Sequence, residues 1–393
     1  MRGRTGRGIR QLLFSLLLML AGSVYAGPVR VFLVAGQSNA NGSGTDAAAL
    51  AAAPEDAEIL FYYRTGAPPA DGTDASSGGA WTHLQAQTDN PGNGNFLNPN
   101  GGFGPEIGIG RELYSNLDTP LAVIKVAYNG TYLYSDWNAV DPAGFRLFPV
   151  LLAETRTALQ ALRDLGHEPW LSGIFWMQGE SDAKSAATAS PAPPQPQTAD
   201  AYPAHLRALV SALRAEWGSE RIPVVIGRLA AIDTTNPPGS SFQYWDSIRA
   251  GQEAVAGRDW MGAWVDTDDL TKSDWLHYDS AGMLTLGRRM AQAWLEAIHK
   301  PARNGRFAAI EVLPEAGETT GPLLRVTLER PVGVSGCTYQ AEGSADLGAW
   351  DDPVGTSDIL PATEPGWEIL RFLADDPLEP GTLRAFRWRI SIP

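Results

Sequence analysis

The sequence is poor in the residues that build disulfide bonds and metal sites. Its single cysteine, Cys337, excludes a disulfide bond within the chain and a zinc site of the cysteine type. The histidines lie far apart, and no two of them have the close spacing of a helical metal site such as H-E-x-x-H. They are His83, His167, His205, His277 and His299. The residue types therefore give no support for metal-dependent catalysis.

Basic residues are also scarce relative to acidic ones. The chain has 30 Lys and Arg against 44 Asp and Glu, which gives a formal net charge of -14. Such a charge repels polyanions in general, although a local basic patch is compatible with it. We therefore expect no nucleic acid among the partners of this protein.

Only one apolar run approaches the length of a targeting segment. The run Leu12–Leu20 follows four arginines and precedes the small residues that end at Ala26. This order is typical of an export signal peptide over residues 1–26. An uncleaved signal anchor is the less favoured alternative, because the run is short for a membrane span. We expect a periplasmic or secreted protein with no membrane span after cleavage, and more acidic still because the segment carries four arginines and no acid.

The order of the apolar segments predicts an α/β domain. A chain of 393 residues exceeds the roughly 250–300 residues of a single core, so two domains are expected. Several apolar runs are continuous, as in strands buried on both faces of a parallel sheet. These runs are Val29–Ala35, Ile59–Tyr63, Leu121–Ala127, Leu171–Met177, Ile222–Leu229 and Met261–Val265. Helical patterns around residues 152–162, 202–217 and 283–298 lie between or after them, which predicts an α/β domain over residues 27–300.

After His299 the pattern changes to short alternating segments separated by Gly, Pro and Asp turns. The segments are Leu323–Leu328, Cys337–Ala341, Glu368–Leu373 and Arg384–Ile392. Pro301 and Gly305 interrupt the last helical pattern just before them. We therefore expect a small β-sandwich-like domain over residues 306–393 that either packs against the first domain or binds a glycan.

The clearest chemical signal follows the first apolar run. The run Val31–Ala35 stops at Gly36 and is followed by Gln37, Ser38 and Asn39. A serine at the carboxyl end of a strand can project its hydroxyl from the sheet edge, and its backbone N–H can face a bound carbonyl. A serine in such a turn more often only caps the chain, so a nearby base is needed to make it a nucleophile. The pattern is not G-x-S-x-G, so an α/β-hydrolase elbow is not indicated.

A base and its orienting carboxylate occur together in the segment Asp274-Trp275-Leu276-His277. The segment follows the last predicted strand of the first domain, so its side chains return to the same edge of the sheet as Ser38. The spacing lets Asp274 reach the imidazole of His277. For the other four histidines a surface or capping role is the better interpretation.

Three motifs taken in order resemble the blocks of SGNH hydrolases. They are Gly36-Gln37-Ser38-Asn39, Gln178-Gly179-Glu180-Ser181-Asp182 and Asp274-x-x-His277. More narrowly, they resemble the sialate O-acetylesterase and carbohydrate esterase family 6 branch, whose blocks read GQSN, QGExD and DxxH. The resemblance covers about residues 29–298 and implies a three-layer α/β/α flavodoxin-like fold with a parallel sheet. It further implies Ser-His-Asp acyl transfer without a cofactor on an acetylated carbohydrate, such as xylan or O-acetylated sialic acid.

The same resemblance assigns the remaining site residues. Asn129-Gly130-Thr131 is similar to the family's GGT block, and it implies an oxyanion hole of Ser38 N–H, Gly130 N–H and the Gln178 side chain. A structural hydrogen bond is the alternative role for Gln178. Asparagine accepts left-handed backbone less freely than glycine, which leaves the turn at position 129 open. Substrate-binding or supporting roles are implied for Gln37, Asn39, Asn129 and Glu180.

Three other functions stay open from the sequence. Glu180 and Asp182 form a carboxylate pair of the kind used in glycoside hydrolysis, although two acids in one turn are more often caps. A non-catalytic carbohydrate-binding protein on a hydrolase scaffold is a second alternative, and the intact serine, histidine and aspartate argue against it. A general small-ester esterase is a third, disfavoured by polar loops rich in Gly and Asn. The sugar, the acetyl position and the oligomeric state are not determined by the sequence.

Overall fold

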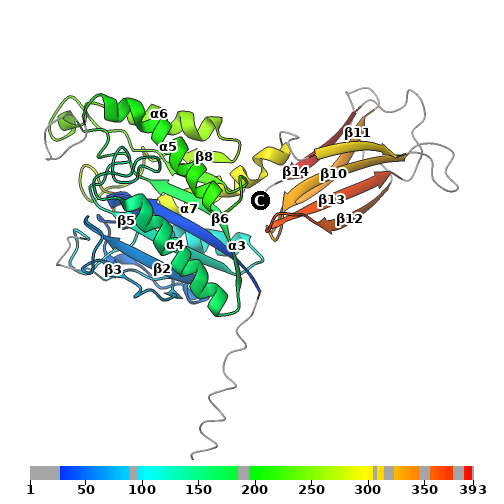
Figure 1. Ribbon diagram of the computed structural model, residues 1–393, viewed down its shortest axis with the longest axis horizontal. Helices are drawn as coiled ribbons and strands as arrows, with labels where there is room; N and C mark the ends of the chain where they lie inside the picture. The colour runs from blue at the N-terminus through cyan, green and yellow to red at the C-terminus, as the bar shows by residue number, and fades with distance from the viewer. Residues whose placement is uncertain are drawn as a thin grey trace, which may run out of the picture.

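The structure is a computed structural model that describes residues 27–88, 95–184, 194–303, 308–313, 323–344, 355–374 and 385–391. The expected signal peptide, residues 1–26, lies outside the described residues. Figure 1 shows two bodies, an α/β domain that contains all the helices of the described residues and a smaller domain of strands beside it. None of the described helices is both long and apolar enough to cross a membrane.

An eight-stranded sheet forms the centre of the α/β domain. Its order is β3-β2-β5-β1-β6-β7-β8, with β4 also paired to β2. The bounds are β1 Pro28–Gly36, β2 Leu60–Gly66, β3 Ala75–Ser76, β4 Thr82–His83, β5 Leu121–Tyr128, β6 Glu168–Met177, β7 Val224–Gly227 and β8 Gly262–Val265. The six longer strands run parallel, and only β3 and β4 pair antiparallel with β2. The predicted parallel sheet is confirmed, and every residue of β5 is buried, as its continuous apolar sequence requires.

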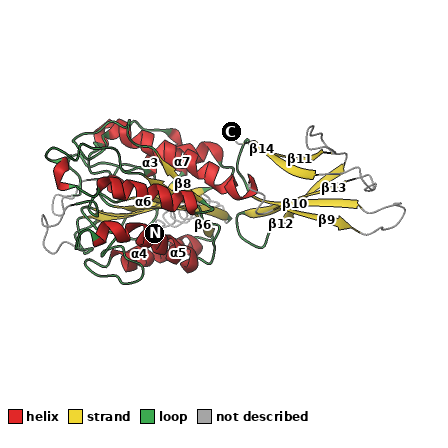
Figure 2. Cartoon of the chain, turned by 90° about the horizontal axis from the view of Figure 1, so that it is seen from above, coloured by secondary structure: helices red, strands yellow, loops and turns green. Residues whose placement is uncertain are grey.

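Helices cover both faces of this sheet. In Figure 2, α4 and α5 lie on one face and α3 and α7 on the other, so the predicted three-layer α/β/α fold is confirmed. The α-helices are α2 Ser38–Asn41, α3 Glu106–Asn116, α4 Leu147–Asp164, α5 Gln197–Glu216, α6 Trp245–Arg258 and α7 Ser280–Arg303. Short 3-10 turns are η1 Ala47–Ala49, η2 Pro54–Glu58 and η3 Gly239–Ser241. The inward stripes are apolar at helical spacing, as in α4, where Leu151, Ala158 and Leu162 are fully buried.

The second domain consists of antiparallel strands, as the alternating sequence predicts. A four-stranded sheet has the order β12-β13-β10-β9, and β11 pairs with β14. The bounds are β9 Ala308–Leu313, β10 Leu323–Pro331, β11 Thr338–Ser344, β12 Gly355–Pro361, β13 Trp367–Ala374 and β14 Ala385–Ser391. Leu324, Val326 and Phe372 of the larger sheet pack with Ala341 of the smaller one. The two sheets therefore share one small core.

The β domain contacts the amino ends of the parallel strands. Arg30 at the start of β1 donates to the carbonyl of Val332, and Arg221 just before β7 pairs with Glu329 of β10. The carboxyl ends of the strands lie at the opposite edge of the sheet, where connecting loops usually build the binding sites of open α/β folds. The molecule thus has one sheet edge closed by a second domain and one edge formed by its own loops.

Candidate active site

Ser38 lies where β1 ends and α2 begins, and it is 5% exposed. Gly36 precedes this turn with φ of 146°, and a Cβ added there would lie 1.9 Å from the carbonyl oxygen of Met177 in β6. Neither the backbone conformation nor the contact is compatible with a larger residue. The turn that places Ser38 at the carboxyl edge of the sheet therefore depends on glycine.

His277 links Ser38 to Asp274 by hydrogen bonds. Its Nε2 lies 3.1 Å from Oγ of Ser38, and its Nδ1 lies 2.8 Å from Oδ2 of Asp274. Oδ1 of Asp274 accepts from the backbone N–H groups of Leu276 and His277 at 2.7 and 2.6 Å. Partial burial opposes ionisation of Asp274, but the hydrogen bonds outweigh it and lower the pKa of the carboxyl. An ionised Asp274 holds the imidazole with Nε2 toward the serine, the geometry of a general base.

Two backbone N–H groups beside the serine are available to a ligand. Those of Ser38 and Gly130 have no hydrogen-bond acceptor among the described residues. Both residues line one cleft, and a Cβ added at Gly130 would meet no atom within 4 Å. Unpaired N–H donors at such a position can stabilise the negative oxygen of a tetrahedral intermediate.

Asn129 does not disturb the turn in which it replaces a glycine. Gly130, with φ of 71°, takes the left-handed conformation, and Asn129 has no positive φ. The side chain of Asn129 donates to the carbonyl of Asn95 at 3.0 Å and accepts from the hydroxyl of Ser43 at 3.0 Å. The substitution therefore ties the loop after β5 to two neighbouring loops.

The structure does not place the side chain of Gln178 in the oxyanion hole, which corrects the expectation drawn from the resemblance. Gln178 is fully buried, and its amide nitrogen donates to Gln37 Oε1 at 3.1 Å, Thr131 O at 3.0 Å and Asp182 Oδ2 at 2.6 Å. With its N–H donors occupied by protein acceptors, it has none left for a substrate oxygen. Gln178 and Gln37 instead join the ends of β1 and β6.

Asn39 and Glu180 support the loop that carries the histidine. Asn39 Nδ2 donates to Glu180 Oε1 at 2.7 Å and to the carbonyl of Leu276 at 3.3 Å, and its Oδ1 accepts from the N–H of Tyr278. Glu180 is 1% exposed, and burial raises the pKa of its carboxyl. Its second oxygen has no hydrogen-bond partner in the described structure, although the residue lines the cleft. These contacts fix the position of His277 from two sides.

Asp182 does not form a glycosidase pair with Glu180. It is fully buried, and its carboxylate accepts from the backbone N–H groups of Leu133 and Tyr134 as well as from Gln178. Glu180 lines the cleft, whereas Asp182 does not. The two acids therefore do not flank a common reaction space, as glycoside hydrolysis requires.

A buried ion pair below α2 was not identified from the sequence. Lys125 of β5 and Glu106 of α3 are fully buried with Nζ and Oε1 3.0 Å apart, and Lys125 also donates to the carbonyl of Asn41 at 2.7 Å. Desolvation lowers the pKa of Lys125, and Glu106 opposes this shift. A lysine inside an otherwise apolar strand is the sequence signal that could have revealed the pair. The ion pair anchors α2, the helix that begins with Ser38.

The cleft around Ser38 and His277 has a volume of about 260 Å³. Its walls include Leu97, Phe242 and Leu276 together with one basic residue, Lys184. Lys184, two residues after the QGExD block, was also missed by the sequence analysis. No carboxylate lies within ion-pair distance of its ammonium in the described structure, and the ammonium lies 6.0 Å from the centre of the Tyr132 ring. Burial lowers the pKa of Lys184, opposed by the more distant Glu180 and Asp182.

Within the described residues, no group of three or more His, Cys, Asp or Glu side chains is arranged to hold a metal ion. The chemistry available at the cleft is that of the hydrogen-bonded serine, histidine and aspartate. Such a constellation transfers an acyl group through a serine ester.

Comparison with known structures gives relatives of low identity. A protein from Arabidopsis thaliana is 21% identical over 68% of this chain and 98% of its own, with a TM-score of 0.47. A carbohydrate acetylesterase from Xanthomonas citri is 15% identical over 91% of this chain and 74% of its own, with a TM-score of 0.43. Est24, a carbohydrate acetylesterase from Sinorhizobium meliloti, is 13% identical over 67% and 96%, with a TM-score of 0.35.

The sequence profile of a single family covers most of the α/β domain. A search of curated proteins finds no match. Residues 28–296 match the carbohydrate esterase family described as sialic acid-specific acetylesterase. The resemblance of the three motifs to carbohydrate acetylesterases of the SGNH type is thereby confirmed. The chain belongs to the sialic acid-specific acetylesterase family of carbohydrate esterases, and it is a carboxylic ester hydrolase.

Proposed function

We propose that this protein is an exported serine esterase that removes O-acetyl groups from an O-acetylated sialic acid. Ser38 is the nucleophile, His277 the general base and acid, and Asp274 the residue that orients the imidazole. The observation that carries the proposal is the unbroken set of hydrogen bonds from Ser38 Oγ through His277 to Asp274 at 3.1 and 2.8 Å inside a cleft. The Arg-rich, then apolar, N-terminal segment supports export.

In the first step, Oγ of Ser38 forms a bond to the acetyl carbonyl carbon while its proton moves to Nε2 of His277. The carbonyl oxygen becomes negative and accepts hydrogen bonds from the N–H groups of Ser38 and Gly130. The bond from carbon to the sugar oxygen then breaks, and His277 returns the proton to that oxygen. The deacetylated sugar leaves, and the acetyl group stays on Ser38.

In the second step, water attacks the acetyl ester on Ser38, and His277 takes a proton from that water. The tetrahedral intermediate again places its negative oxygen at the same two N–H groups. The bond to Oγ breaks, the serine regains a proton from His277, and acetate is released.

Lys184 favours an anionic sugar over neutral xylan. Its ammonium lies in the cleft with no carboxylate partner within 4.0 Å in the described structure. A partly buried cation gains most when a ligand supplies the opposite charge. The carboxylate of a sialic acid provides that charge, whereas an acetylated xylose unit has none.

The test is release of acetate from O-acetylated sialic acid, acetylated xylan and a small aryl acetate. We expect Ser38→Ala to lower kcat by at least about 10³-fold on every ester, while Ser115→Ala, an exposed serine on α3, has no effect. Retained activity in Ser38→Ala would refute the catalytic assignment.

Substrate choice has a separate readout. We expect Lys184→Gln to raise KM for O-acetylated sialic acid about tenfold and to leave the aryl acetate unchanged, because a hydrogen bond to a charged group is worth about 1.5–3 kcal/mol. Lys272→Gln is the matched control, since Lys272 is also half-buried but lies outside the cleft. Preference for acetylated xylan, or an equal effect of Lys184→Gln on both esters, would contradict the anionic substrate.

Amino-terminal sequencing of the exported protein tests cleavage after Ala26.

A further inference from the structure

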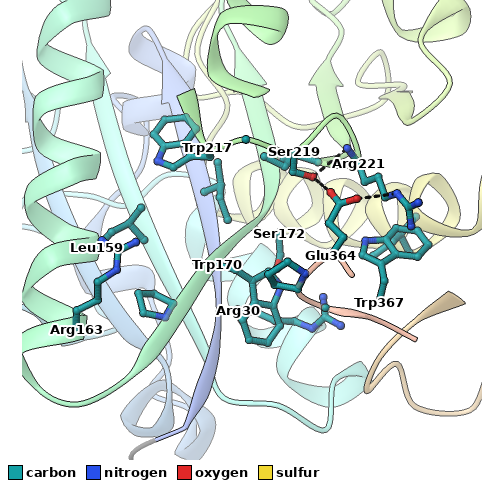
Figure 3. A pocket seen from close by; sticks show the side chains of 17 residues that line it. Arg30, Leu159, Arg163, Trp170, Ser172, Trp217, Ser219, Arg221, Glu364 and Trp367 are labelled. Carbon is teal, nitrogen blue, oxygen red and sulfur yellow. Dashed lines mark hydrogen bonds and ion pairs between the residues drawn. The ribbon is translucent and has the colours of Figure 1, made fainter. Parts of the chain in front are cut away.

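A second cavity, of about 220 Å³, lies at the edge of the sheet opposite the catalytic cleft. It is bordered by the amino ends of β1 and β6 and by the loop between β12 and β13 of the second domain. In Figure 3, Arg163 and Trp217 lie on one side of this cavity and Glu364 and Trp367 on the other. Both domains therefore contribute walls, and no residue of the catalytic site takes part.

The cavity contains a buried cation without an anionic partner. Arg30 is 1% exposed, and no carboxylate forms an ion pair with it in the part of the chain that the structure describes. Its side chain donates to Thr119 Oγ1 at 3.2 Å and to the carbonyl of Val332, and its guanidinium lies 5.4 Å from the ring of Trp170. Burial lowers the pKa of Arg30 to about 10, so the group is still charged at neutral pH. Arginines buried to this degree are normally paired with an anion.

The remaining polar groups of the cavity leave it with an excess of positive charge. Arg221 is paired with two carboxylates, those of Glu364, 2.8 Å away, and of Glu329, so it adds no positive charge to the cavity. Arg163, exposed in the last turn of α4, has no carboxylate partner among the described residues. Ser172 is 5% exposed, and its hydroxyl has no hydrogen-bond partner in the described structure. Two unpaired guanidinium groups and an unsatisfied hydroxyl thus border one space in a protein whose net charge is -14.

The apolar part of the lining suits a sugar ring. The indoles of Trp170 and Trp217 and the ring of Pro365 border the cavity. Flat aromatic surfaces beside hydrogen-bonding groups match a pyranose, which has an apolar face and polar edges. The volume is below the roughly 300–1,000 Å³ of pockets for drug-sized ligands, which limits the occupant to about one sugar residue.

We propose that this cavity is a second carbohydrate-binding site, which takes a single uronic or sialic acid residue whose negative charge is balanced by the excess positive charge of Arg30 and Arg163. Because it lies at the opposite edge of the sheet from Ser38, it binds a sugar without hydrolysing it. Its role is to anchor the enzyme on an acidic glycan while the cleft acts on acetyl esters. The inference does not rest on the proposed function, since its ligands need no acetyl ester.

The experiment is isothermal titration of the full mature protein with glucuronate and with N-acetylneuraminate, beside glucose, N-acetylmannosamine and sulfate. We expect both sugar acids, or one of them, to bind, and the neutral sugars and sulfate to bind at least about tenfold more weakly. Whichever acid binds more tightly identifies the source of the carboxylate. Equal binding of the neutral sugars, equal binding of sulfate, or no binding of either acid would overturn the proposal.

Paired variants locate the binding. We expect Arg163→Gln to weaken it about tenfold, because a charge-assisted hydrogen bond is lost, and Ser172→Ala to weaken it less. Arg258→Gln is the matched control, since Arg258 is also exposed in the last turn of its helix, α6. Lys184→Gln should remove only binding of N-acetylneuraminate to the catalytic cleft and should keep the binding that Arg163→Gln weakens. Binding that is lost in Lys184→Gln and kept in Arg163→Gln would place the sugar acid in the catalytic cleft and overturn the proposal.

Discussion

Buried charged groups have different partners at the two edges of the parallel sheet. At the carboxyl edge, the buried carboxylates receive hydrogen bonds from the same domain, as Glu180 does from Asn39 and Asp182 from Gln178. At the amino edge, Arg30 is as deeply buried but has no carboxylate partner in the described structure, and the second domain offers it only the carbonyl of Val332. The residues of the first edge are sufficient for the proposed proton transfer, whereas the buried arginine of the second edge needs an anionic ligand to balance its charge.

This difference indicates how the two domains divide the work. Every residue that the proposed mechanism uses lies between positions 38 and 277, in the α/β domain. The cavity at the amino edge needs residues of both domains. Catalysis and glycan anchoring can therefore be disabled separately.

The largest expected effect is a loss of esterase activity without a loss of sugar-acid binding. Asp274→Asn should lower kcat/KM by about 10²–10⁴-fold, because the amide places N–H donors where Oδ2 now accepts from His277 Nδ1. The amide oxygen can still accept from the N–H groups of Leu276 and His277, so the loop should keep its shape. Titration with the sugar acids should be unchanged. Asp269→Asn, an exposed acid paired with Arg289, serves as the control in both assays.

A loss of sugar-acid binding in Asp274→Asn would show that the sugar acid binds at the catalytic site and not at the amino edge. Near-normal esterase activity would instead remove Asp274 from the mechanism. Either outcome would contradict the assignment of catalysis to the carboxyl edge and of sugar binding to the amino edge.

The next effect concerns stability and the close backbone approach at Gly36 on the carboxyl edge. Gly36→Ala should destabilise the protein by at least about 3 kcal/mol, because the new methyl group would lie 1.9 Å from the carbonyl oxygen of Met177. Gly257→Ala, in helix α6 with no atom within 4 Å of the added Cβ, should be neutral or stabilising by up to about 1 kcal/mol. Urea unfolding of both variants measures the difference. Equal stabilities would show that the turn after β1 tolerates a side chain.

The grouping of Ser38, His277 and Asp274 at one sheet edge could be predicted because its signals are local. Gly36 and Ser38 follow a continuous apolar strand, and Asp274 lies one turn of chain before His277, so strand order alone brings them to one edge. The helices α3 and α6 were missed because their sequences lack a strong apolar stripe. In α3, Gly108 lets α7 approach so closely that a Cβ there would meet the carbonyl oxygen of Leu284 at 2.5 Å. Small residues at a tight helix contact give no periodic hydrophobic signal.

Other features depend on contacts that no local pattern carries. The sequence does not tell whether the amide of Gln178 points at the cleft or at Asp182, because the choice depends on the packing of three loops. Arg30 in its strand appears as an ordinary exposed arginine. Its burial results from the second domain and from the nearby indoles of Trp170 and Trp294.

The smallest expected effect is a change of folding stability with pH. It should be seen for a variant of Glu180, the buried acid of the carboxyl edge, and not for a variant of Arg30, the buried base of the amino edge. Burial raises the folded-state pKa of Glu180, so wild type loses stability as pH rises from the unfolded value of about 4.3 through the folded value. Glu180→Gln lacks this loss. The stability of the variant relative to wild type should therefore increase with pH over this range, by about 1.4 kcal/mol for each unit of elevation, and then level off.

Urea unfolding of wild type and Glu180→Gln from pH 4 to pH 8 measures this gap. Arg30→Gln is the comparison at the other edge: the Arg30 pKa of about 10 lies above the range, so its gap from wild type should stay constant. A flat stability difference would show that the pKa of Glu180 is not raised by folding, and a stability of Glu180→Gln relative to wild type that falls as pH rises would show that Glu180 is stabilised in its charged form. Either result contradicts the expectation, and the second has a physical explanation. The hydrogen bond from Asn39 would then outweigh burial, and Glu180 would act as a charged support of the histidine loop rather than as a neutral one.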